Sequence, residues 1–314
     1  MLDAALLFRA IDDAAELGYN WISFSGGEPL LYRPLLALLQ HTKLRGLHTA
    51  IATNGMLLRP RLLDAIAPHI DLLAISIDGT PESHNVIRNH DRAFETMRDR
   101  LDALRERNIP FGFIFTLTQF NLHELQWVVE FALEQGAQSV QIHPLDEVGH
   151  ATDEMRGAAP DSIETAYAWL VRQQLQTAVG AQLAIHIDLI FSEALKENAQ
   201  HFYAATDTCD AATPLADLLA PLIIESDGTV VPMQYGFSRQ YALGTLTRST
   251  LSEMATNWQL DKMHSFYALC RRAHVAVCNE AAPRFLSWYD AVADIARRES
   301  MRIERRVHRA VSNS

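Results

Sequence analysis

The chain alternates short apolar runs with amphipathic helical patterns from residue 1 to about residue 190, and this alternation limits the possible folds more than any other feature. Short runs such as Leu72–Ile77 are typical of buried strands, and helical spacing recurs in segments such as 2–17. Strands that alternate with helices form a parallel sheet covered by helices. The expected strands are 21–25, 48–52, 72–77, 111–117, 138–143 and 183–189.

Between these strands the sequence predicts amphipathic helices. The first begins almost at Met1, and no capping residue is evident before it. Six strands joined in this way predict an α/β fold, a partial TIM-like (β/α)6 barrel. The expected helices are 2–17, 34–45, 60–68, 91–107, 122–135 and 161–179.

After residue 205 the pattern changes. Residues 222–232 predict a β-hairpin around the Asp227-Gly228 turn. Helices are expected near 249–269 and 282–297, followed by an arginine-rich tail that we interpret as solvated and partly helical. The sequence therefore predicts two domains, the barrel in 1–205 and a small α+β extension in 206–314.

Composition excludes several classes of protein. The chain has 314 residues, of which 48% are hydrophobic, so it can bury a substantial core. Its formal net charge of −11 argues against binding to nucleic acid or to a membrane surface. No run reaches transmembrane length, and no signal peptide is evident. The three cysteines are widely spaced and do not suggest a disulfide scaffold. We therefore expect the protein to be located in the cytoplasm.

Small polar residues lie at the carboxyl ends of the predicted strands 48–52, 72–77, 111–117 and 138–143. Ligands of an α/β barrel bind at the carboxyl ends of the strands, so these side chains predict a bound polar cosubstrate. The residues are Thr53 and Asn54, Ser76 and Asp78, Thr116, Thr118 and Asn121, and His143.

The turn after the first expected strand reads Ser25-Gly-Gly-Glu-Pro29. Its two glycines allow a ligand to approach the backbone closely. Their carbonyl groups and the Glu28 carboxylate form a set of acceptors suited to an ammonium group. Pro29 adds no donor and fixes the direction in which the chain leaves. The alternative is an ordinary turn between strand and helix with a surface glutamate.

In this order, the motifs resemble those of the radical S-adenosylmethionine (SAM) enzymes over the whole barrel. In that family the Gly-Gly-Glu-Pro motif holds the amino group of SAM. For His143, an alternative to a role in ligand binding is a structural histidine that is only hydrogen-bonded to its neighbours. The resemblance implies that Gly26, Gly27, Glu28 and Pro29 meet the methionine ammonium of SAM and that Thr53 and Asn54 line the same wall. It also implies that Ser76 and Asp78 lie near the methionine carboxylate or the ribose, and that Thr116 and Thr118 approach the ribose or the carboxylate. By the same resemblance, His143 lies near the adenine or the substrate.

One part of the family pattern is missing. Radical SAM enzymes carry a CxxxCxxC loop before Gly-Gly-Glu-Pro that holds a [4Fe-4S] cluster, whereas the first cysteine here is Cys209. A strand and loop of that kind take about 25 residues. The sequence therefore predicts either a family member that lacks its beginning, with its first strand, or a cluster-free descendant.

The C-terminal third resembles the SPASM or twitch extension of this family. Such extensions place cysteines around a hairpin, and here Gly244 follows the hairpin in the expected Gly-x-Leu pattern. Met233 stands where a hairpin cysteine is expected. Three thiolates could hold an auxiliary cluster with one open iron, or they could be ordinary buried cysteines. They are Cys209, Cys270 and Cys278.

The resemblance implies reductive cleavage of SAM to a 5′-deoxyadenosyl radical and hydrogen abstraction from a peptide or a cofactor precursor. It also implies an electron donor such as flavodoxin or ferredoxin. No residue is singled out as catalytic. The alternative is a cluster-free, inactive homologue that binds SAM or a peptide. An unrelated hydrolase or aldolase would need a strand-end lysine or a metal cluster of acids and histidines, which the strand ends lack.

Overall fold

The computed structural model describes residues 2–145, 155, 157–199, 213–279 and 282–312, with side chains up to Met301 in the last helix. The chain divides into two compact units. The barrel unit comprises Asn20–Leu189, and the C-terminal unit combines Met1–Tyr19 with Ile190–Ser314. The domain boundary predicted between residues 205 and 206 stays a prediction.

A six-stranded sheet forms the centre of the barrel unit. Each strand is parallel to its neighbours, in the order β1-β2-β3-β4-β5-β6. The predicted α/β class and the six predicted strands are confirmed. The strands are β1 (Trp21–Phe24), β2 (His48–Thr53), β3 (Leu72–Ile77), β4 (Phe111–Leu117), β5 (Ser139–Pro144) and β6 (Ala184–Ile187).

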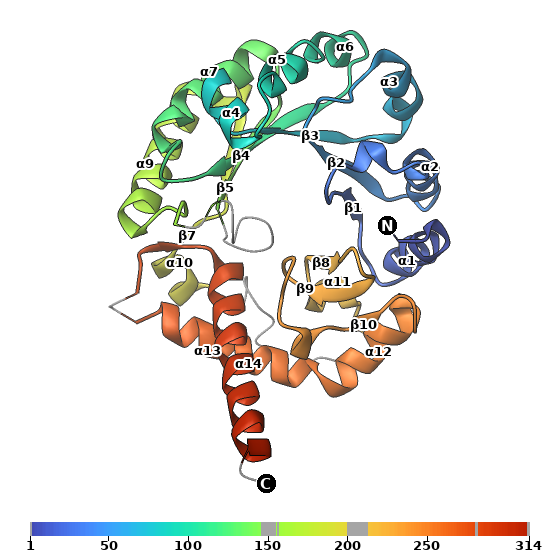
Figure 1. Ribbon diagram of the computed structural model, residues 1–314, viewed down its shortest axis with the longest axis vertical. Coiled ribbons are helices and arrows are strands. Elements are labelled where there is room, and N and C mark those ends of the chain that lie inside the picture. The colour runs from blue at the N-terminus through green and yellow to red at the C-terminus, as the bar shows by residue number, and fades with distance from the viewer. Residues whose placement is uncertain (1, 146–154, 156, 200–212, 280–281, 313–314) are drawn as a thin grey trace. The chain divides into compact units, whose positions relative to one another are not determined.

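Helices connect successive strands and lie along the outer side of the curved sheet (Figure 1). Local signals set some of their ends: Gly136 ends one helix with a φ of 75°, and Asp161 begins another in a capping box with Glu164. The helices are α2 (Leu35–Leu44), α3 (Pro60–Ile66), α4 (Pro81–Ile87), α5 (Ala93–Arg98), α6 (Leu101–Glu106), α7 (Leu125–Gln135) and α9 (Ser162–Val179), with 3-10 turns η1 (Pro29–Leu31), η2 (Ala67–His69), η3 (Leu122–Glu124) and η4 (Gly180–Gln182).

The two faces of the sheet differ in burial. Leu73, Ile75 and Ile77 of β3 are fully buried and belong to the main hydrophobic core with the outer helices. Because successive strand residues point to opposite faces, the residues between them lie on the other face, which we call the inner face. The inner face carries Ala52, Ala74, Ser76, Ile114, Thr116, Gln141, His143 and His186.

Strand register brings the polar residues of the inner face together near its carboxyl edge. Thr116 of β4 is paired with His143 of β5, and Gln141 of β5 is paired with His186 of β6. Near the amino end of β4, only a glycine fits at position 112, because a Cβ there would lie 2.3 Å from Ser139 Oγ of β5. The carboxyl edge is therefore the polar part of this face.

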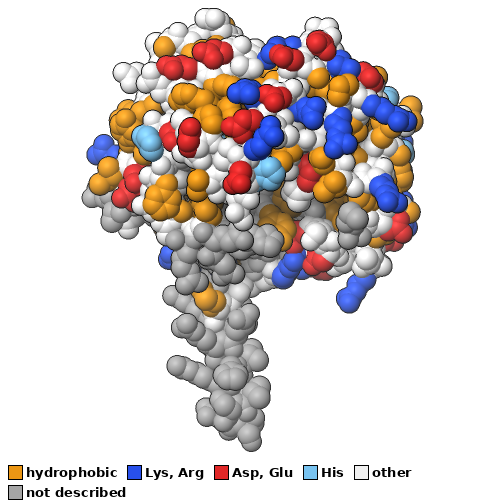
Figure 2. Space-filling view, turned by 45° about the horizontal axis from the view of Figure 1, so that its top comes forward, with side chains coloured by type: hydrophobic (Ala, Val, Ile, Leu, Met, Phe, Trp, Pro, Cys, Tyr) orange, Lys and Arg blue, Asp and Glu red, His pale blue; other side chains and the backbone are white. Residues whose placement is uncertain are grey.

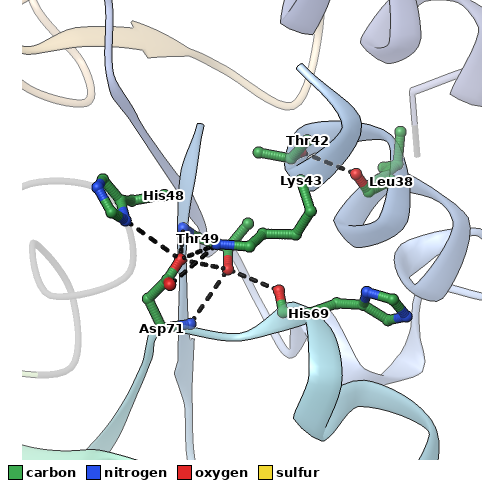
Figure 3. Close-up of polar contacts among 7 residues, drawn as sticks. All are labelled: Leu38, Thr42, Lys43, His48, Thr49, His69 and Asp71. Atoms are coloured by element: carbon green, nitrogen blue, oxygen red, sulfur yellow. Dashed lines mark hydrogen bonds and ion pairs between the residues drawn. The ribbon is translucent and has the colours of Figure 1, made fainter. Parts of the chain in front are cut away.

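At the amino ends of β2 and β3, the Asp71 carboxylate ties both strands to α2 (Figure 3). Lys43 Nζ donates to its two oxygens at 2.9 and 2.8 Å, and the Thr49 amide donates at 2.7 Å. Burial alone would raise the pKa of Asp71, but the hydrogen bonds from Lys43 and Thr49 hold it below its usual range. This cluster lies at the end of the barrel associated with stability rather than ligand binding.

The C-terminal unit joins the first helix to the last third of the chain. The Ser252 amide donates to Asp13 Oδ2 at 3.2 Å, and the predicted hairpin 222–232 is present in a three-stranded antiparallel sheet. Its elements are α1 (Ala4–Glu16), β7 (Ile190–Phe191), α10 (Ser192–Glu197), α11 (Leu215–Leu218), β8 (Leu222–Ile224), β9 (Thr229–Pro232), η6 (Arg239–Tyr241), β10 (Gly244–Thr245), α12 (Leu251–Asp261), α13 (Met263–Val277), β11 (Phe285–Leu286) and α14 (Trp288–Ser312).

Three expectations about helices were wrong. The helix predicted over 2–17 has a cap, because Asp3 accepts a hydrogen bond from the Ala5 amide at 2.9 Å. The helix predicted over 91–107 is interrupted, and there the Arg100 amide bonds to the Met97 carbonyl at 3.0 Å in a tighter turn. Neither glycine nor proline marks this break. The helix predicted over 249–269 likewise divides into α12 and α13 at Lys262.

Within the described residues, no helix is long and apolar enough to cross a bilayer. On the face shown in Figure 2, acidic and basic side chains are interspersed. That mixture gives this face no broad single-sign field of the kind that attracts polyanions. The absence of nucleic-acid and membrane partners, and the cytoplasmic location, stay predictions.

Candidate functional site

The turn after β1 leaves its backbone open. Residues 25–27 are exposed, and Gly26 has a φ of 124°, which side chains with a Cβ rarely adopt. A Cβ at Gly26 or at Gly27 would meet no atom of the described residues within 4 Å. The glycines are therefore not required by packing inside the protein, and the space above them is available to a ligand.

The Glu28 carboxylate holds this turn to the end of β2. Oε1 accepts from the Leu30 amide at 3.0 Å and from Thr53 Oγ1 at 2.8 Å, and Oε2 accepts from the Asn54 amide at 3.0 Å. A carboxylate offers about four acceptor positions, so these bonds occupy Oε1 and leave one position on Oε2. Glu28, Thr53 and Asn54 thus lie together. Their contact with SAM stays a prediction.

Asp78, which follows β3, is enclosed. Arg88 binds its carboxylate with two bonds, Nε to Oδ2 at 2.5 Å and Nη2 to Oδ1 at 3.1 Å. His84 Nδ1 accepts from the Asp78 amide at 3.1 Å, and burial lowers the pKa of His84 to about 4. The Asp78 side chain is 1% exposed. Its carboxylate is engaged by Arg88, which the sequence did not single out, and its predicted contact with SAM remains a prediction.

Asn121 joins the carboxyl ends of β3 and β4. Its Nδ2 donates to the carbonyls of Asp78 at 3.0 Å and Thr116 at 2.9 Å. Its Oδ1 accepts from the amide and hydroxyl of Thr118 at 2.8 and 3.0 Å. Thr118 is 1% exposed, so its hydroxyl serves this turn, whereas Thr116 lies on the half-exposed inner face.

Buried Glu124 supports the same loops from η3. It accepts from the Thr80 amide at 2.7 Å and from Ser83 Oγ at 2.6 Å. Gly79 is required here, because a Cβ at that position would lie 1.8 Å from Glu124 Oε2. These bonds fix the loop after β3 without placing a charge on the inner face.

His143, near the end of β5, faces Asp188, which follows β6. His143 Nδ1 contacts Asp188 Oδ2, and Gln141 Nε2 donates to Asp188 Oδ1. The two paired side chains are 43% and 41% exposed. The sequence analysis named His143 and missed Asp188. The signal was present, since Asp188 is the polar residue at the carboxyl end of the sixth strand.

The predicted thiolate ligands are only partly described. Cys209 lies outside the described residues. Cys270 is fully buried, and burial raises its pKa to about 12. Burial also raises the pKa of Cys278, whose sulfur lies 3.5 Å from His274 Nε2. Among the described residues, no three His, Cys, Asp or Glu side chains are grouped to hold a metal ion. The auxiliary cluster stays a prediction.

The parallel sheet, its polar carboxyl edge and the open glycine turn define a partial α/β barrel with a candidate ligand site at the carboxyl ends of its strands. Residues 1–132 match the Radical SAM superfamily. The chain is 29% identical over 207 residues to the AdoMet-dependent heme synthase of Methanosarcina barkeri, covering 65% of this chain and 59% of that protein. It is 29% identical over 185 residues to the PqqA peptide cyclase of Ruegeria pomeroyi, covering 58% of this chain and 50% of that protein.

A solved structure of native anSMEcpe with bound AdoMet and Kp18Cys peptide has the same fold. Its TM-score is 0.60 at 16% identity, and the alignment covers 100% of this chain and 92% of that one. Residues 1–132 are thus similar to the radical SAM superfamily, and both curated relatives are similar over a longer part of the chain. The chain spans 59% and 50% of the lengths of the two curated relatives it matches.

Similarity to this superfamily implies SAM and a [4Fe-4S] cluster, and the residues present fit only the first. The exposed glycine turn offers backbone groups and free space for the polar end of SAM. The cluster that binds SAM does not fit the barrel unit, because that unit contains no cysteine. The chemistry that the barrel unit itself can supply is therefore the binding and orientation of SAM.

Proposed function

We propose that the chain is the SAM-binding barrel of a radical SAM enzyme that modifies a peptide. The observation that carries the proposal is the Gly26-Gly27 turn, whose backbone is open while Glu28 holds it to the neighbouring strand end. In this superfamily the radical chemistry would be supplied by SAM and a [4Fe-4S] cluster, and the part that falls to the residues of this barrel would be to hold SAM.

The residues of this chain would bind and orient SAM. Carbonyl groups of the glycine turn accept from its ammonium group, and the open position on Glu28 Oε2 is one further acceptor. Ser76 and Thr116 lie on the inner face beside this edge, where their hydroxyls can bind ribose or carboxylate. Asp78 and Thr118 would act indirectly, by holding the loops after β3 and β4.

A peptide is the substrate class that we favour. One curated relative is named a peptide cyclase, and the superposed structure contains a peptide. A tetrapyrrole-like cofactor precursor is the second class, since another relative is named a heme synthase. An electron donor such as flavodoxin or ferredoxin, and a cytoplasmic location, belong to the same proposal.

The proposal is tested by titrating SAM into the chain by calorimetry. Gly27 has an ordinary φ and open space around it, so Gly27→Ala should leave the fold unchanged while its methyl group obstructs SAM. We expect about tenfold weaker binding. Gly46→Ala is the control for a methyl group added far from the turn: Gly46 also has open space, it lies just before the amino end of β2, and its φ of 74° makes this variant the more strained of the two. Absence of SAM binding, or equal affinity in all three proteins, would contradict the proposal.

A cluster-free homologue that binds SAM or a peptide is the second candidate. It is favoured by the absence of cysteine from the barrel unit. Anaerobic reconstitution with iron and sulfide, followed by iron counting and assay for 5′-deoxyadenosine with dithionite, separates the two. SAM binding without iron and without 5′-deoxyadenosine would support the cluster-free candidate for this chain, whereas turnover would support the enzyme.

A further inference from the structure

At the carboxyl edge of the inner face, an imidazole from β5 and a carboxylate from the residue after β6 face each other. His143 Nδ1 contacts Asp188 Oδ2, while Gln141 Nε2 donates to Asp188 Oδ1. An ionised carboxylate only accepts hydrogen bonds, so Nδ1 of His143 carries a hydrogen. In the neutral imidazole, Nε2 is then left as an acceptor. The carboxylate therefore selects one tautomer.

The exposure of this pair separates it from a structural histidine. His84 also lies beside an aspartate, but the His84 and Asp78 side chains are 2% and 1% exposed. Arg88 already neutralises Asp78. His143 and Asp188, by contrast, are 43% and 41% exposed, and among the described residues no lysine or arginine pairs with Asp188. The charge of Asp188 is thus directed to His143, whose ring can reach a ligand.

We propose that His143 transfers protons to and from a ligand bound at this edge of the sheet, with Asp188 as its positioning residue. The inference rests on the proposed function and deepens it. In the step, an N–H or O–H bond of the ligand breaks and an N–H bond forms at His143 Nε2. The electron pair of the broken bond stays on the ligand, and Asp188 stabilises the imidazolium. No electron is transferred, and the proton later returns to the ligand or to water.

The tautomer provides a test that does not depend on turnover. Long-range ¹H–¹⁵N spectra of the whole chain should show the hydrogen of neutral His143 on Nδ1. In Asp188→Asn, Gln141 continues to donate to the carbonyl oxygen, so the new amide faces His143 with its NH₂ group. His143 Nδ1 must then accept, and the hydrogen moves to Nε2. Gln141→Met is the matched variant, because it keeps the carboxylate and should keep the wild-type tautomer.

Chemical labelling tests the reactivity of the same nitrogen. Diethyl pyrocarbonate modifies neutral imidazole nitrogens, and mass spectrometry resolves each histidine. His186 is the internal control, since it is exposed on the same face. At pH 8 we expect His143 to react faster than His186, and Asp188→Asn to slow the labelling of His143 severalfold while leaving His186 unchanged, because Nε2 of His143 then carries the hydrogen. Equal labelling rates for His143 and His186, or an unchanged His143 tautomer in Asp188→Asn, would overturn the proposed pairing of His143 with Asp188.

SAM, the probe for the site, distinguishes failure of this inference from failure of the proposed function. Saturating SAM should slow the labelling of His143 severalfold and leave exposed His264 unchanged. If calorimetry shows that SAM binds but His143 is labelled at the same rate, His143 does not face that ligand and the inference is wrong, while the proposed function stands. If SAM does not bind, the proposed function fails, whereas the tautomer and the labelling rates measured without SAM still decide the pairing of His143 with Asp188.

Discussion

At the scale of single residues, we expect Glu28 both to stabilise the turn after β1 and to bind SAM, and one substitution should reveal both effects. Three donors of the chain point at its oxygens. In Glu28→Gln, an amide NH₂ must face at least one of these donors. We expect the free energy of unfolding to fall by about 1–3 kcal/mol, as for an unsatisfied buried group, and SAM to bind about tenfold more weakly. Thermal unfolding and calorimetry measure the two effects.

The control for this prediction is Glu82→Gln, which changes an exposed glutamate in the first turn of α4. It should alter neither quantity appreciably. If Glu28→Gln unfolds like the wild type and binds SAM equally well, the carboxylate is only a surface feature of the turn.

Asp71 predicts a pH dependence at the other end of the sheet. Its folded pKa is depressed, so its contribution to stability is present above the unfolded pKa and is lost as pH falls through the folded value. Asp71→Asn should therefore lower the free energy of unfolding most above about pH 5, and the difference from wild type should narrow in more acidic solution. Urea titrations at several pH values measure this.

Exposed Asp99, which pairs with Arg98 at 2.9 Å, provides the comparison. Asp99→Asn should change the free energy of unfolding by less than about 1 kcal/mol at every pH. A difference between Asp71→Asn and wild type that stays constant with pH would show that the Asp71 carboxylate contributes no proton-linked stability.

At this scale the sequence located most of the strand-end residues but not their partners. Thr53 and Asn54 could be predicted because they directly follow a recognisable strand. Arg88 and Glu124 could not, because they reach Asp78 and Thr80 through helices and turns whose orientation depends on packing. Thr118 and Thr116 look alike in sequence, yet one is enclosed by Asn121 and the other lies on the inner face.

At the scale of elements, the connection from β3 to α4 depends on Gly79. It has a φ of 136°, and a Cβ there would meet Glu124 Oε2 at 1.8 Å. Gly79→Ala should lower the free energy of unfolding by about 3 kcal/mol, because it combines backbone strain with displacement of the Glu124 bonds. Gly46→Ala, with a φ of 74° and no neighbour within 4 Å, should cost about 1 kcal/mol. Equal losses in denaturant titrations would contradict this account.

Elements were predicted best where one face is buried. β3 and β4 have the predicted bounds, since fully buried alternate residues give an unambiguous pattern. The division of 91–107 into α5 and α6 was not predictable, because buried Phe94, Met97, Leu101 and Leu104 continue at helical spacing across it. The pattern records which side faces the core and not whether the backbone bonds are continuous.

At the scale of the whole molecule, the edge of the sheet predicts an association behaviour. β1 lies at one end of the six-stranded order and, among the described residues, pairs only with β2. A free edge strand presents unpaired backbone groups to other chains. We expect the chain to associate as its concentration rises, and Ser23→Lys, a charge on exposed β1, to reduce this.

Light scattering over a concentration series measures this association. Thr177→Lys adds the same charge to exposed α9 and should leave the association unchanged. If the wild type stays monomeric throughout, or if both lysine variants behave alike, the β1 edge does not mediate association.

The position of α1 in the C-terminal unit has a consequence for biosynthesis. The helix leaves the ribosome before the barrel unit, but its hydrogen-bond partners come after that unit: the Ala216 amide binds the Leu17 carbonyl at 3.1 Å, and the Ser252 amide binds Asp13. The intervening barrel unit is continuous in sequence, so it can complete its sheet during translation. Until α12 has emerged, the apolar stripe of α1 stays uncovered on the nascent chain. During that interval it can associate wrongly with other apolar segments, and a chaperone can bind it.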